Sequence, residues 1–124
     1  MIEREEFERI AEEVFYTLPA VLQNRIENVH IVVEDEPSEE TKRRMKISEG
    51  SVLLGLYEGV PLNRRGTHYG SYPVVPDKVT LYQKNIESAA GTRTALHEKI
   101  REVLIHEIGH YYGMTEEQVR DAGY

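Results

Sequence analysis

The sequence of 124 residues contains no cysteine and no long hydrophobic run. Without cysteine the chain forms no disulfide and offers no thiolate ligand to a metal, so nothing points to an oxidising compartment. No apolar stretch approaches the roughly 18 residues that span a membrane. The first eight residues lack both the basic and the apolar part of a secretory signal. We therefore expect a cytoplasmic protein that does not associate with a membrane.

Positive charge is also scarce. The chain has 15 Lys and Arg against 22 Asp and Glu, which gives a net charge of -7. This balance argues against binding to nucleic acid or to anionic lipid, because both carry negative phosphates. A chain of this length with 40% hydrophobic residues can bury one core. We predict a single domain over residues 1–124; none of these properties indicates an oligomeric state.

The most informative pattern is His-Glu-Ile-Gly-His at residues 106–110, followed by Gly113. On a helix His106 and His110 lie one turn apart and project in nearly the same direction, so both imidazoles can bind one zinc ion. Glu107 lies about 60° around the helix from His110, where it can reach a water on the metal as a general base. The alternative is a helix with two histidines on a packed face, each hydrogen-bonded to the protein.

The apolar residues around this motif predict a long amphipathic helix. They occupy an arc from about 60° to about 260° around the helix, measured from His106. These residues are Leu96, Ile100, Val103, Leu104, Ile105, Ile108, Tyr111 and Tyr112. His97 falls about 180° from His106 by the same geometry, so we expect it to be a surface or packed residue outside the metal site.

A third metal ligand has to come from after the helix. Gly113 suits the left-handed position that ends a helix, and Thr115 opens a capping-box pattern for a short closing helix. Glu116, ten residues after His106, stands where the longer H-E-x-x-H-x-x-G-x-x series places its last ligand. Glu117 and Asp121 are the other carboxylates within reach. The helix dipole alone also favours acidic residues at the start of a helix, but on spacing we predict Glu116.

On these residues the chain resembles the small bacterial zincin-like metallopeptidase family, whose short members end soon after an H-E-x-x-H-x-x-G-x-x-Asp motif. Residues 53–62 and 76–82 are also similar to segments of that family. In this chain Glu116 replaces the expected Asp, and no Met follows it, so the Met-turn of the metzincins is absent.

The resemblance implies an α+β, zincin-like fold with a small mixed β-sheet packed on an N-terminal helix and the long motif helix. It implies a zinc-dependent peptidase that acts on a peptide or protein substrate, with zinc held by His106, His110 and Glu116 and with Glu107 as general base. It also makes the strand predicted at 78–86 a platform for the substrate backbone. A rival from another class is a zinc-stabilised or peptide-binding domain without turnover. A fourth protein ligand from Glu117, Asp121 or His68 would favour that rival.

Periodicity places the remaining elements. Apolar residues from Phe7 to Leu18 recur at helical spacing and predict a helix before Pro19, with a short turn at 20–25. Residues 29–34, 51–58 and 78–86 are predicted strands, and 42–46 a solvated helical turn. Residues 59–77 have no period and are expected to form a loop. Several of its side chains are candidates to stabilise an oxyanion, although a plain surface connection would have the same composition. These are Arg64, Arg65, His68, Tyr69 and Tyr72.

Overall fold

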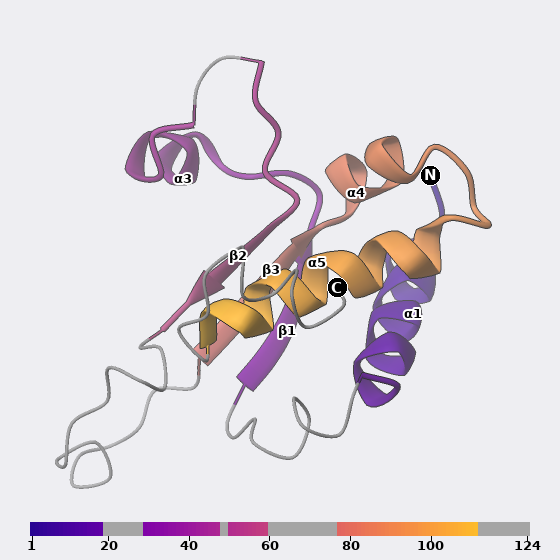
Figure 1. Cartoon of the computed structure of the whole chain (residues 1–124). Helices are drawn as coiled ribbons and strands as arrows, with labels where there is room; N and C mark the ends of the chain where they lie inside the picture. The colour runs from indigo at the N-terminus through magenta and orange to yellow at the C-terminus, as the bar shows by residue number, and fades with distance from the viewer. Residues whose placement is uncertain (19–28, 48–49, 60–76, 112–124) are drawn as a thin grey trace, which may run out of the picture.

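A computed structural model describes residues 1–18, 29–47, 50–59 and 77–111, with the backbone alone at 110 and 111. Its helices and strands follow one another along the chain as Figure 1 shows. They are α1 (Arg4–Tyr16), β1 (Val29–Glu34), α3 (Glu39–Arg44), β2 (Gly55–Glu58), β3 (Asp77–Tyr82), α4 (Gln83–Ala90) and α5 (Leu96–Tyr111). No helix among the described residues is long and apolar enough to cross a bilayer.

The described strands form one small mixed sheet in the order β1-β3-β2. β1 runs parallel to β3, with Val33 opposite Leu81, and β2 runs antiparallel to β3, with Gly55 opposite Leu81. β3 is therefore the central strand, and β2 is an edge strand of the sheet that the structure describes. The prediction of a small mixed sheet is confirmed.

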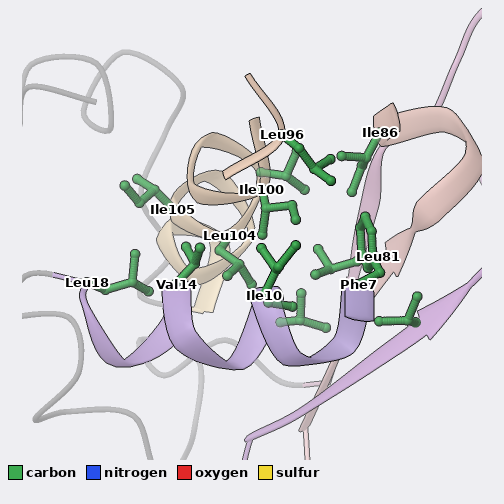
Figure 2. Packing of buried hydrophobic residues seen from close by; sticks show 14 of the residues in the cluster. Phe7, Ile10, Val14, Leu18, Leu81, Ile86, Leu96, Ile100, Leu104 and Ile105 are labelled. Atoms are coloured by element: carbon green, nitrogen blue, oxygen red, sulfur yellow. The ribbon is translucent and has the colours of Figure 1, made fainter. Parts of the chain in front are cut away.

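α1 and α5 cover one face of this sheet. Val33, Val79 and Leu81 point from that face into a single apolar cluster with residues of both helices. Figure 2 shows Ile10 and Val14 of α1 next to side chains of α5, and Phe7 beside Leu81 of β3. Each fully buried aliphatic or aromatic side chain of this kind stabilises the fold by about 1.5–3 kcal/mol. The predicted α+β architecture, with two helices against a sheet, is what the structure has.

The sequence of α1 explains its place in the core. Phe7, Ile10, Ala11 and Val14 recur on one side of the helix, and all four are buried. Glu5 and Glu6 lie in the first turn, where the helix dipole favours negative charge. The helix ends at Tyr16, and the Thr17 hydroxyl donates to the Val14 carbonyl at 2.8 Å. The predicted N-terminal packing helix is confirmed.

The strand predicted at 78–86 is wrong beyond Tyr82. The chain leaves β3 and enters α4 at Gln83. α4 ends at Ala90 and is followed by Gly91, whose φ of 78° is left-handed. Gln83 is buried like the residues of β3 before it, but its side-chain amide is held by polar partners rather than by the sheet. It donates to the Ile2 carbonyl at 2.8 Å and accepts from Arg4 Nε at 3.0 Å.

The other strand predictions hold to different degrees. β1 covers residues 29–34 as predicted. The strand expected at 51–58 is shorter, because only 55–58 pair with β3. The basic segment belongs to the short helix α3, which begins after Ser38, whose hydroxyl accepts from the Thr41 amide at 3.1 Å. The turn predicted at 20–25 lies outside the described residues.

Candidate metal centre

α5 runs without interruption from Leu96 to Tyr111 and so carries the whole His-Glu-x-x-His segment. Its inner side presents a residue to the core at every fourth position. These residues are Leu96, Ile100, Leu104 and Ile108. His106 and Glu107 stand just outside that row and are half-buried. His97 is exposed on the other side, as predicted. The helix therefore places His106 and Glu107 at the rim of the core, where both are partly exposed.

Glu107 lies against the edge strand β2. A Cβ atom built on Gly55 would lie 2.7 Å from Val103 Cγ1 and 3.3 Å from Glu107 Cγ. Real Cβ atoms do not approach other atoms as closely as the first distance, so the helix reaches β2 only because residue 55 is a glycine. We did not predict a role for Gly55 from the sequence. A glycine inside an apolar strand pattern was the signal, since it often marks a close approach of backbone.

A second contact fastens the far end of β2 to the start of β3. The Tyr57 hydroxyl donates to Asp77 Oδ2 at 2.5 Å, and Asp77 is 4% exposed. The Asp77 side chain occupies the space above Gly59, where a Cβ would overlap Asp77 Oδ1. Asp77 is not part of a loop, as the prediction for 59–77 has it, but is the first residue of β3. These contacts hold β2 in register beside α5.

The pKa of the Tyr82 phenol depends on the charged residues around this part of the sheet. Burial, together with the carboxylates of Glu34 and Glu58, raises the pKa of Tyr82 to about 12. The Arg44 guanidinium lowers this pKa, and the Glu107 carboxylate raises it further. Tyr82 is therefore a neutral phenol at physiological pH, and Glu107 is close enough for its charge to act on it.

The remaining predicted site residues fall largely outside the described part of the chain. α5 includes residue 110, but the His110 side chain is not among the described atoms, and neither are Glu116, Glu117 and Asp121. The loop candidates Arg64, Arg65, His68, Tyr69 and Tyr72 also lie outside it. The described residues alone contain no group of three or more His, Asp or Glu side chains that could hold a metal ion. The assignment of His110 and Glu116 as ligands stays a prediction.

The prediction that the strand at 78–86 is the platform for the substrate backbone is wrong. β3 is bonded to β1 on one side and to β2 on the other, so its backbone has no open edge for a substrate. In the described sheet β2 is the edge strand that contacts the motif helix, through Gly55. The order of strands follows from tertiary packing, which the alternation of residues along a strand does not encode.

Comparison with known proteins decides the family. Residues 26–124 match the family model of zincin-like metallopeptidases. The chain belongs to the zincin-like metallopeptidase family. The family resemblance predicted from the motif is thus confirmed, and the zincin-like assignment covers β1 through the motif helix and the residues that follow it.

A solved structure has the same fold. It is a conserved hypothetical protein from T. thermophilus, with a TM-score of 0.56 and 22% sequence identity. The alignment covers 88% of this zincin-like chain and 92% of the other. No curated protein matches the chain.

Proposed function

We propose that this protein is a zinc-dependent peptidase in which Glu107 is the general base and His106, His110 and Glu116 hold the metal. The observation that carries the proposal is the position of Glu107. It stands on a continuous motif helix and lies against an edge strand of the sheet. Membership of a metallopeptidase family supports the same chemistry.

The proposed donor set suits a zinc ion. His106 is half-buried, and it shares the helix with His110 one turn later. Two imidazoles and one carboxylate are a donor set typical of catalytic zinc, which keeps a further position open. When bound, zinc lowers the pKa of a water and polarises a carbonyl.

Glu107 would carry the proton during peptide hydrolysis. Its carboxylate accepts a proton from the attacking water and returns it to the leaving amine nitrogen. Because Glu107 lies against Gly55, a peptide that pairs with β2 along the edge where the described sheet ends would pass beside this carboxylate. We propose β2, rather than the central strand β3, as the platform for the substrate backbone.

Two substitutions on α5 separate metal binding from turnover. Glu107→Gln keeps the size and shape of the side chain but cannot accept the proton, so we expect one zinc per chain and turnover lower by about 10²–10⁴-fold. His106→Ala should lose both zinc and turnover. His97→Ala is the matched control, because His97 is exposed on the same helix away from the site. Metal content by mass spectrometry and cleavage of a mixed peptide library measure the two properties.

The same measurements distinguish the proposed peptidase from the rival, non-catalytic domain. A wild-type protein that binds one zinc but cleaves no peptide would favour the non-catalytic, zinc-stabilised or peptide-binding domain. Undiminished cleavage by Glu107→Gln would contradict the role of Glu107. Glu116→Gln should weaken zinc binding, whereas Glu117→Gln and Asp121→Asn should not, if Glu116 is the third ligand.

A further inference from the structure

We infer that Gly55 is a positioning residue for the reaction: its missing side chain lets α5 lie close enough to β2 to hold Glu107 beside the edge strand. This inference rests on the proposed function and assigns a new role within it. Gly55 itself contributes no group to the chemistry. It acts through Glu107, whose Cγ would lie 3.3 Å from a Cβ built at residue 55.

The backbone of β2 does not require a glycine at this position. The glycines with left-handed φ values among the described residues are Gly50, Gly59 and Gly91, and Gly55 is not one of them. It lies within a strand, buried, opposite Leu81. A glycine weakens a strand relative to residues that have a side chain to pack. The reason for glycine here is therefore the space beside it.

That space is enclosed on several sides. A Cβ at residue 55 would lie 2.7 Å from Val103 Cγ1, 3.2 Å from the Thr80 carbonyl oxygen and 3.3 Å from Glu107 Cγ. The Thr80 carbonyl belongs to the backbone of the central strand, so it cannot move aside without disturbing the sheet. Val103 and Glu107 are one turn apart on the same side of α5. A methyl group at 55 would thus push the helix away from β2 at Val103 and press on Glu107 directly.

The chemistry is sensitive to such a displacement. Misplacing a catalytic group by about 1 Å can lower the rate by about 10²-fold. The three atoms nearest to a Cβ at residue 55 belong to Val103, Thr80 and Glu107 and not to the proposed zinc ligands. We therefore expect the Glu107 side chain to shift relative to the zinc while the zinc affinity persists. A loss of kcat without a loss of zinc is the signature that separates positioning of Glu107 from damage to the metal site.

The test uses Gly55→Ala, Val103→Ala and the double variant of the full chain. In Gly55→Ala we expect kcat to fall at least about tenfold, with KM and the zinc Kd within about threefold of wild type. Val103→Ala removes the closest contact, so the double variant should recover most of the lost kcat. Val103→Ala alone is the control and should keep the wild-type kcat.

A spectroscopic measurement does not depend on turnover. In protein labelled with ¹³C at glutamate carboxyls, the signal of Glu107 is the one that disappears in Glu107→Gln. It should shift in Gly55→Ala and return toward its wild-type position in the double variant.

The outcomes are distinct from failure of the proposed function. Wild-type kcat in Gly55→Ala, simultaneous loss of zinc binding, or a folded double variant without recovery would overturn the inference. If the wild-type protein cleaves no peptide, the proposed function fails and the Glu107 signal decides: an unmoved signal in Gly55→Ala overturns the role of Gly55. If Gly55→Ala does not fold, the double variant is measured instead. Recovery of both folding and turnover in the double variant would support the inference.

Discussion

α5 makes two contacts of opposite character with its neighbours. Toward α1 and the core it presents a row of large side chains, with Ile100 and Leu104 both 0% exposed. Figure 2 shows these two residues filling the space beside α1. Toward β2 it presents Val103 and Glu107 against a glycine. One contact is made by filling space with side chains, and the other by removing a side chain.

The difference shows how one helix separates stability from function. By helical geometry the row of Val103 and Glu107 lies between the core row and the row of His106 and His110. The core row fixes the helix, and the contact with β2 sets where the half-buried polar residues stand. Changes in the core row should therefore alter the free energy of unfolding, whereas a side chain added at Gly55 should alter turnover.

Leu104→Ala is the strongest test of the core contact. Removing a fully buried leucine leaves a cavity, and we expect the free energy of unfolding to fall by about 2–5 kcal/mol. The zinc content and the kcat of the protein that remains folded should stay close to wild type. Chemical denaturation measures the first quantity and a peptide assay at low temperature the second.

Val52→Ala is the matched control for Leu104→Ala. Val52 is 65% exposed, so shortening it should change stability by less than about 0.5 kcal/mol. A small effect of Leu104→Ala, or a large loss of kcat in its folded fraction, would show that the two contacts of α5 are not separable.

Zinc binding at the histidine side of α5 should change the free energy of unfolding by an amount between those of the other predictions. A ligand that binds only the folded state stabilises it, by about 2.7 kcal/mol when its concentration is 100 times Kd. We expect zinc to raise the free energy of unfolding by this amount in wild type and in Glu107→Gln. Adding a chelator should reverse the gain.

The two histidines described on α5 make this prediction specific. His106→Ala should remove the stabilisation by zinc, and His97→Ala should retain it, because His97 is exposed away from the site. Equal stabilisation of wild type and His106→Ala would place the zinc elsewhere in the chain.

Features that depend on the local periodicity of the sequence were predictable. The strand at 29–34 was predicted with its observed ends, and the apolar arc around His106 predicted both the helix and the buried set that includes Ile100 and Leu104. The family followed from the spacing of the motif. Each of these patterns is set by neighbours within a few turns of the chain.

Features that depend on contacts between residues far apart in the sequence were not predictable. Gln83 continues the sequence pattern predicted for the strand, but it begins α4 and is held by Arg4 and Ile2, about eighty positions earlier. The central place of β3 and the close approach of α5 to Gly55 arise when the sheet and helix assemble. Periodicity carries no information on such contacts.

Tyr82→Phe tests the charge on the sheet near Glu107 and has the smallest expected effect. The folded-state pKa of Tyr82 is raised from 10.0 to about 12, so its contribution to stability is complete below pH 10 and is lost as the pH rises toward 12. Over the interval from pH 10 to 11 the wild type should lose roughly 1 kcal/mol more than Tyr82→Phe. Urea denaturation at a series of pH values compares the two proteins, and the difference between them removes the titration of the other tyrosines. Parallel curves above pH 10 would mean that Tyr82 ionises equally in the folded and unfolded chains, and that neither burial nor the carboxylates of Glu34, Glu58 and Glu107 act on it.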